Sequence, residues 1–103
     1  LAYCDWAGTQ ALNAYGPTET TVNATFGRLE RGRRASIGTP MVNLCAWVVG
    51  RWGVPQPRGA MGELWIGGAS VATGYTNRHA LTAEKFPVIG TDVAPMRCYR
   101  TGD

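Results

Sequence analysis

The sequence has little histidine and lysine, and its cysteines are not paired by spacing. One histidine, one lysine and three cysteines (Cys4, Cys45 and Cys98) occur in 103 residues, and no Cys-x-x-Cys spacing is present. This scarcity argues against a zinc site and against a disulfide framework. Scattered cysteines without a framework favour a reducing compartment, so we expect a cytoplasmic protein.

Long apolar runs are also missing. No segment approaches the roughly 20 apolar residues of a membrane-spanning helix, and no signal peptide is visible, so we expect no membrane partner. The hydrophobic content of 45% and the charged content of 17% are typical of a folded domain. The length allows at most one domain with a modest core. Because the chain starts at Leu1 rather than Met and stops at Asp103, we expect a fragment of a longer protein.

The net charge of +3 is concentrated in one arginine-rich segment. Four arginines gather there: Arg28, Arg31, Arg33 and Arg34. A basic patch can bind nucleic acid, which would give a steep salt dependence. Aromatic residues are not interleaved with these arginines, so a solvated loop is favoured and a nucleic-acid partner is the remote alternative.

Local patterns predict a mainly β fold with minor α content. Strands are expected at residues 10–15, 43–49, 63–66 and 97–100, with a further candidate at 70–75. The pair Gly67–Gly68 is expected to end the third of these strands. A short helix is predicted at 81–86, with Thr82 as its N-cap and Pro87 as its stop. A threonine within 18–25 is expected to cap a helical turn, and residues 27–36 and 52–61 to form loops.

Seven consecutive residues, from Asn13 to Glu19, carry the types of side chain that a nucleotide site requires. They read Asn-Ala-Tyr-Gly-Pro-Thr-Glu. An aromatic ring can stack on a base, an amide can bond to a base edge, a hydroxyl can meet a phosphate, and a carboxylate can hold Mg²⁺. Taken singly, the same residues are as easily a core aromatic, a turn, a helix cap and a solvated carboxylate.

Two further motifs follow in order. Residues 62–75 read GELWIGGASVATGY, and residues 99–103 read YRTGD. Segments 36–40 (SIGTP) and 81–86 (LTAEKF) accompany them. With the first motif, this order resembles the adenylation domain of nonribosomal peptide synthetases, within the acyl-adenylate-forming superfamily. The resemblance implies a distorted β-barrel subdomain at residues 26–103. It also implies the end of a preceding α/β subdomain at residues 1–25.

The resemblance also implies a two-step reaction. An amino acid attacks the α-phosphate of ATP to form an aminoacyl-adenylate, and the acyl group then passes to the phosphopantetheine thiol of a peptidyl carrier protein domain. Mg²⁺ and fixed donors would offset the phosphate charge. The family's phosphate loop with its lysine and its C-terminal lysine domain are not in this sequence, and Lys85 belongs to the predicted helix. We therefore expect no catalytic residue here and no activity from the fragment without the remainder of the domain.

Residue roles follow from the same resemblance. Tyr15 would stack on adenine, Asn13 and the Ala14 backbone would contact its edge, and Gly16 would let the backbone approach. Thr18 would contact phosphate and Glu19 would hold Mg²⁺. The implied nucleotide-binding residues are thus Asn13, Ala14, Tyr15, Gly16, Thr18, Glu19 and Asp103, the last at the ribose hydroxyls. The implied substrate-pocket residues are Ala14, Val22 and Asn23.

Some features depart from the family or leave alternatives open. Ser70 and Thr73 stand where the family usually has glycine and arginine, and Gly67–Gly68 does not have the spacing of a phosphate loop. Acyl-CoA synthetases and aryl-acid ligases share the segment from Tyr15 to Glu19, so they remain the nearest alternative. The residues Asn13-Ala14 and Pro17, and the segment Thr-Ala-Glu-Lys-Phe at 82–86, favour the peptide-synthetase branch. A β-rich interaction domain without chemistry would not explain three ordered motifs.

Overall fold

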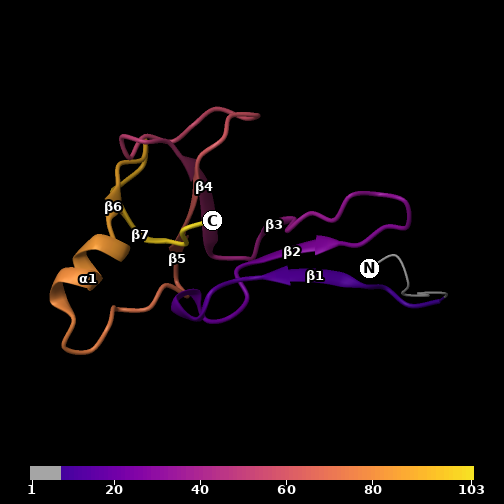
Figure 1. Cartoon of the computed structure of the whole chain (residues 1–103), viewed down its shortest axis with the longest axis horizontal. Helices are drawn as coiled ribbons and strands as arrows, with labels where there is room; N and C mark the ends of the chain where they lie inside the picture. Colours follow the sequence, from indigo (N-terminus) through magenta and orange to yellow (C-terminus); the bar gives the residue numbers. More distant parts are fainter. Residues whose placement is uncertain (1–7) are drawn as a thin grey trace.

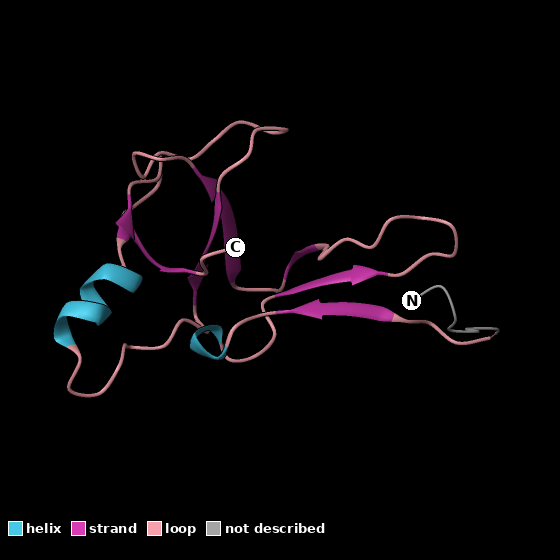
Figure 2. Ribbon diagram, in the orientation of Figure 1, coloured by secondary structure: helices cyan, strands magenta, loops and turns pink. Residues whose placement is uncertain are grey.

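A computed structural model describes residues 8–103, and it confirms the mainly β class with minor α content (Figures 1 and 2). The elements are β1 (Leu12–Tyr15), the 3-10 turn η1 (Thr18–Thr20), β2 (Thr25–Arg28), β3 (Thr39–Pro40), β4 (Leu44–Val49), β5 (Glu63–Gly68), α1 (His79–Lys85), β6 (Val88–Ile89) and β7 (Met96–Arg100). Within this part of the chain no helix is long and apolar enough to cross a membrane.

A small antiparallel sheet has the order β1-β2-β3 and extends away from the rest of the molecule (Figure 1). Leu12 pairs with Arg28 and Tyr15 with Thr25. Strands β2 and β3 were not predicted from the sequence, whose pattern indicated a loop from residue 27. The strands form because glycines allow close backbone approach: a Cβ on Gly27 would lie 2.4 Å from the Ser36 carbonyl oxygen. The basic segment that follows β2 is exposed from residue 30 to residue 40.

A second antiparallel sheet, with the order β4-β5-β7-β6, holds the core. The central strand β5 has a partner on each side, and its residues Trp65, Ile66 and Gly67 are all buried. The main cluster of buried residues is Val49, Trp65, Ile89 and Cys98, with Trp47 and Met96 packed against it. Burial raises the pKa of the Cys98 thiol to about 11, so this cysteine behaves as an apolar core residue.

Strand β5 runs through the glycine pair that was expected to end it. Gly67 pairs with Cys45 on β4 and with Cys98 on β7. A Cβ on Gly67 would lie 2.9 Å from the Met96 sulfur, so the missing side chain makes room for the core. Gly67 is thus a packing position inside the sheet and the turn comes after it, at residues 69–70.

The strand predicted at residues 70–75 is absent, since this segment has no regular secondary structure. Its carbonyl groups bond to a side chain instead of to a strand. The guanidinium of Arg97 on β7 donates to the oxygens of Ala72 and Thr73, each at 2.6 Å. The same guanidinium lies 4.5 Å from the ring centroid of Phe86. This arginine therefore fixes an irregular segment against the sheet.

The N-cap predicted at Thr82 is wrong, and the threonine that caps η1 is Thr21, at the C-terminal end of that turn. Helix α1 begins at His79 with Arg78 at the N-cap, which leaves Thr82 inside the helix. The Thr82 hydroxyl accepts the backbone N–H of Tyr75 at 2.9 Å and so joins the helix to the preceding segment. At η1 the N-cap is Pro17 without a side-chain bond. Pro17 nevertheless fits a helix start, because it has no N–H to leave unpaired. The predicted stop before Pro87 is confirmed.

Candidate nucleotide-binding site

The motif at residues 13–19 runs along β1, turns after Tyr15 and enters η1. The turn brings two backbone segments very close, since a Cβ on Gly16 would lie 2.5 Å from the Val22 carbonyl oxygen and 2.6 Å from the Ala24 nitrogen. The Ala24 N–H donates to the Tyr15 oxygen at 2.8 Å, which closes the loop. Glycine at position 16 is therefore required by the packing of the backbone.

The loop that follows η1 contains two residues in the left-handed region. Thr21 has φ +60° and Val22 has φ +69°, which is unusual for β-branched residues. The Thr21 hydroxyl donates to the Ser70 oxygen at 2.9 Å, and the Asn23 N–H donates to the Thr21 oxygen at 2.8 Å. The predicted substrate residues Val22 and Asn23 lie on this strained loop, and both are exposed.

Tyr15 and Asp103 meet although 88 residues separate them in the sequence. The Tyr15 hydroxyl donates a hydrogen bond to Oδ2 of Asp103. Burial and the adjacent Asp103 carboxylate raise the pKa of Tyr15, so the phenol stays protonated and acts as a donor. The sequence placed these two residues in different motifs, and the fold brings them to one place.

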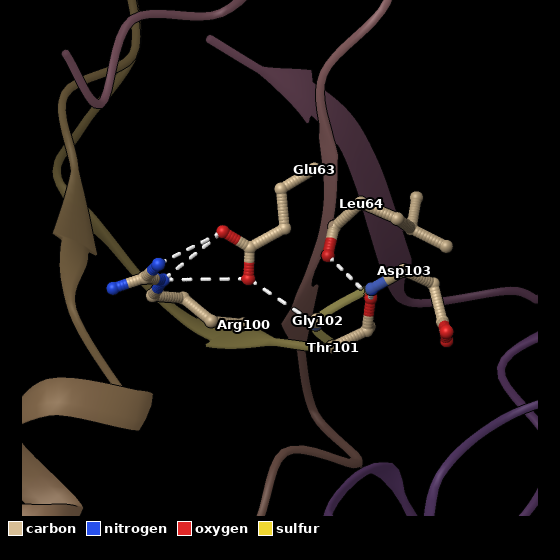
Figure 3. A network of polar contacts seen from close by, with 6 residues as sticks. All are labelled: Glu63, Leu64, Arg100, Thr101, Gly102 and Asp103. Carbon is tan, nitrogen blue, oxygen red and sulfur yellow. Dashed lines mark hydrogen bonds and ion pairs between the residues drawn. The ribbon is translucent and has the colours of Figure 1, made fainter. Parts of the chain in front are cut away.

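The backbone of Asp103 is held beside β5 (Figure 3). The Leu64 N–H donates to the Asp103 oxygen at 2.9 Å, and the Asp103 N–H donates to the Thr101 hydroxyl at 3.1 Å. The Thr101 hydroxyl in turn donates to the Leu64 oxygen at 2.8 Å. The side chain of Asp103 projects away from these contacts (Figure 3).

Glu19 is held by the segment that follows β5. The Tyr75 hydroxyl donates to Oε1 of Glu19 at 2.5 Å, and the Ala72 N–H donates to the Glu19 backbone oxygen at 2.8 Å. The Tyr75 bond outweighs partial burial and holds the pKa of Glu19 below its usual range. Burial and the Glu19 contact raise the pKa of Tyr75. Glu19 is consequently an ionised carboxylate with one oxygen fixed by a neutral phenol.

Tyr75 was not among the site residues predicted from the sequence, yet it is the side chain that holds Glu19. Its ring packs on Phe86, with centroids 5.5 Å apart, and Phe86 packs on Tyr99 at 5.2 Å. This aromatic group gives the Tyr75 hydroxyl a fixed position next to Glu19. The signal was present, because Tyr75 closes the GELWIGGASVATGY motif, but a motif alone does not say which carboxylate it meets.

The remaining predicted nucleotide-binding residues lie on β1 and at the start of η1. The Asn13 amide donates to the Ser36 oxygen at 3.0 Å, which ties β1 to the segment before β3. Ala14 is exposed on β1 opposite Phe26, and Thr18 is exposed at the start of η1. Among residues 8–103 no group of three or more histidine, cysteine, aspartate or glutamate side chains is placed to hold a metal ion.

Comparison with known proteins places the chain in a family. The family model for AMP-binding enzymes matches residues 2–76. Bacitracin synthase 3 of Bacillus licheniformis is 48% identical over 99 residues, covering 95% of this chain and 2% of that protein. Tyrocidine synthase 3 of Brevibacillus parabrevis is 45% identical over 93 residues, covering 88% of this chain and 1% of that protein. The chain thus spans a very small part of these relatives.

Solved structures show the same similarity. The N-terminal subdomain of NpsA from Klebsiella oxytoca, in complex with 3-hydroxyanthranilyl-AMSN, matches 92% of this chain and 24% of its own, with a TM-score of 0.83 and 33% identity. A four-domain nonribosomal peptide synthetase bound to AMP and glycine matches 91% of this chain and 7% of its own, with a TM-score of 0.84 and 38% identity. The resemblance to adenylation domains is confirmed, and the chain belongs to the family of AMP-binding enzymes.

Proposed function

We propose that this chain forms the nucleotide side of an adenylation site that activates an amino acid with ATP. The observation that carries the proposal is the meeting of Tyr15 and Asp103 across 88 residues of sequence. An adenine ring stacked on Tyr15 would bring its ribose toward the Asp103 carboxylate, which can accept from two hydroxyls. Asn13, the Ala14 backbone and Gly16 would surround the base, and Thr18 would meet a phosphate.

Glu19 fits the role of a magnesium ligand. Its lowered pKa keeps it ionised, and the Tyr75 hydroxyl occupies Oε1, so Oε2 is the oxygen we assign to the ion. Mg²⁺ commonly takes one or two carboxylates together with substrate phosphates and water. When bound, the ion would offset the charge on the phosphates of ATP.

The proposal also includes two parts of the chain: the end of an α/β subdomain at residues 1–25 and a β-rich subdomain at residues 26–103. The boundary between them falls within β2.

The acid that is activated would be chosen partly by Ala14, Val22 and Asn23. Exposure of Val22 and Asn23 on a strained loop is consistent with a surface that receives a substrate. A second candidate is an aryl acid, because the similar NpsA structure is in complex with a 3-hydroxyanthranilyl compound. The similar peptide synthetase bound to AMP and glycine, with the higher identity of 38%, favours an amino acid.

A peptidyl carrier protein domain is the proposed acceptor of the acyl group. One similar structure, at 27% identity, is a protein containing adenylation and carrier domains bound to a vinylsulfonamide inhibitor. Phosphopantetheine on such a carrier would supply the accepting thiol. The scattered cysteines support a cytoplasmic location for the whole enzyme.

The test uses a chimera in which residues 8–103 replace the matching segment of the adenylation domain that was solved with AMP and glycine. Amino-acid-dependent exchange of pyrophosphate into ATP is measured across a panel of amino acids, aryl acids and fatty acids. We expect exchange with one or a few amino acids, and loss of exchange in the Asp103→Ala variant. Exchange with aryl or fatty acids alone would move the chain to the acyl-ligase branch. A folded chimera that neither exchanges pyrophosphate nor binds AMP would contradict the proposal.

The contact between Tyr75 and Glu19 gives a prediction about the metal. Tyr75→Phe removes one hydroxyl, and we expect the Mg²⁺ concentration for half-maximal exchange by the chimera to rise about 10-fold, because a residue that orients a metal ligand is worth 10–100-fold in affinity. The KM for the amino acid should stay unchanged. An unaltered Mg²⁺ titration would show that Tyr75 does not orient the carboxylate.

The same variant has a pH signature. The folded pKa of Glu19 is lowered, so the bond from Tyr75 stabilises the fold above the ordinary glutamate pKa of about 4.3. This stabilisation is lost as the pH falls through the lowered pKa. The difference in unfolding midpoint between the chimera and its Tyr75→Phe variant should therefore be present at pH 7 and vanish in acid.

A further inference from the structure

We propose that Glu63 is a positioning residue for the ribose-binding carboxylate of Asp103, acting through Arg100 and the backbone of Gly102. This inference rests on the proposed function, because it takes Asp103 as the residue that meets the ribose. Glu63 lies at the start of β5, far before Asp103 in the sequence, and it belongs to a network of polar contacts at the end of β7 (Figure 3).

The first contact in the network is a two-pronged ion pair across β5 and β7. Nε and Nη2 of Arg100 donate to Oε2 of Glu63 at 3.2 and 3.0 Å, and Nε also lies 3.4 Å from Oε1. Burial is the largest influence on Glu63 and opposes its ionisation, but the hydrogen bonds to the carboxylate and the charge of Arg100 together hold the pKa of Glu63 below its usual range. Both nitrogens converge on Oε2, so this oxygen is held beside the guanidinium by charge-assisted hydrogen bonds.

The second contact reaches the turn that leads to Asp103. Oε1 of Glu63 accepts the backbone N–H of Gly102 at 3.2 Å. Gly102 has φ +82°, a conformation that glycine adopts without strain and that redirects the chain after β7. The same carboxylate thus holds the end of β7 through Arg100 and the turn through Gly102.

The third part of the network returns the chain to β5. Thr101 donates to the Leu64 oxygen through its hydroxyl at 2.8 Å and its N–H at 3.1 Å, and the Leu64 N–H donates to the Asp103 oxygen at 2.9 Å. Glu63 and Leu64 are adjacent on β5, so one short piece of strand receives both ends of the turn. The result is an Asp103 carboxylate that accepts from the Tyr15 hydroxyl.

If Glu63 only stabilised the sheet, its loss would lower the stability of the whole fold and would not act on the ribose in particular. The side chains of Arg100 and Glu63 are 37% and 23% exposed, and partly exposed ion pairs contribute little to global stability. Loss of Glu63 should therefore loosen the turn while the sheet remains folded. A displaced Asp103 would weaken binding of the ribose more than binding of the amino acid.

The experiment compares Glu63→Ala and Glu63→Gln in the chimera defined above. For Glu63→Ala we expect the KM for ATP to rise about 10-fold, as for loss of a hydrogen bond to a charged group, while the KM for 2′-deoxy-ATP rises less and that for the amino acid stays constant. Glu63→Gln keeps an oxygen that can accept from the Gly102 N–H, so its KM for ATP should lie between those of the unsubstituted chimera and of Glu63→Ala. In an Asp103→Ala background, Glu63→Ala should raise the KM for ATP by a further factor of less than about 2, because the effects of coupled residues are not additive.

Glu30→Ala is the matched control, since Glu30 pairs with Arg33 at 2.9 Å in the exposed loop, and it should change neither the KM for ATP nor the KM for the amino acid.

Amide hydrogen exchange and pyrophosphate exchange together separate this inference from the proposed function. Amide hydrogen exchange of residues 101–103 without ligand should quicken at least about 5-fold in Glu63→Ala, as expected for a locally loosened turn. If the unsubstituted chimera does not exchange pyrophosphate into ATP, the proposed function fails. Amide hydrogen exchange alone then decides whether Glu63 positions the turn. Unchanged amide exchange, or equal losses with ATP and 2′-deoxy-ATP, would overturn the inference.

Discussion

Gly38→Ala is expected to destabilise the chimera by about 4 kcal/mol or more, which is exceptional for a single substitution. Gly38 has φ +76°, and a Cβ there would lie 1.7 Å from the Phe26 carbonyl oxygen and 2.2 Å from its carbon. Both atoms are backbone, so no rotamer change relieves the overlap. The β2–β3 pair would separate, and the Ser36 oxygen that accepts from Asn13 would move with it.

Gly32→Ala is the matched control for this prediction. Gly32 has the same φ of +76°, but nothing lies within 4 Å of its Cβ position. The control thus carries the backbone strain without the overlap, and it should cost about 1–2 kcal/mol. Urea unfolding of the two variants measures the difference. Equal midpoints for Gly38→Ala and Gly32→Ala would contradict the close approach of residue 38 to β2.

Gly16→Ala is expected to weaken AMP binding about 100-fold. The new Cβ would meet the Val22 oxygen at 2.5 Å and the Ala24 nitrogen at 2.6 Å, so the two backbone segments must separate. That separation breaks the bond between Ala24 and Tyr15 and displaces the ring and the η1 turn together. Stacking of a base on an aromatic side chain is worth about 1–3 kcal/mol, so loss of the stacked position accounts for a change of this size.

Gly90→Ala controls for the loss of a glycine as such. Nothing lies within 4 Å of a Cβ at position 90, and its backbone is not in the left-handed region. Calorimetric titration with AMP should show wild-type affinity for Gly90→Ala and a large loss for Gly16→Ala. Wild-type affinity in both variants would mean that the Gly16 turn does not set the position of Tyr15.

The sequence predicted those elements whose pattern is local. Strand β4 carries consecutive β-branched and aromatic residues, and α1 ends before Pro87, so both were found close to their observed bounds. The three ordered motifs predicted the family, which the similarity to AMP-binding enzymes confirms. The assigned nucleotide and substrate residues stay predictions.

Features that depend on distant partners could not be read from the sequence. Strands β2 and β3 are four and two residues long and pair with each other only at Thr25–Pro40 and Phe26–Thr39, so no apolar alternation marks them. The segment 70–75 looked like a strand because nothing local indicates that Arg97, 24 and 25 residues away, takes its carbonyls. Glu63 and Tyr75 likewise acquire roles through contacts 37 to 56 residues away.

A crystal structure of the chimera with AMP would test the central claim most directly, namely that the two ends of this chain combine to hold one nucleotide. We predict adenine stacked on the ring of Tyr15 and both ribose hydroxyls within about 3 Å of the Asp103 carboxylate, the usual hydrogen-bond distance. AMP bound elsewhere, or bound here with its ribose turned away from Asp103, would contradict the account.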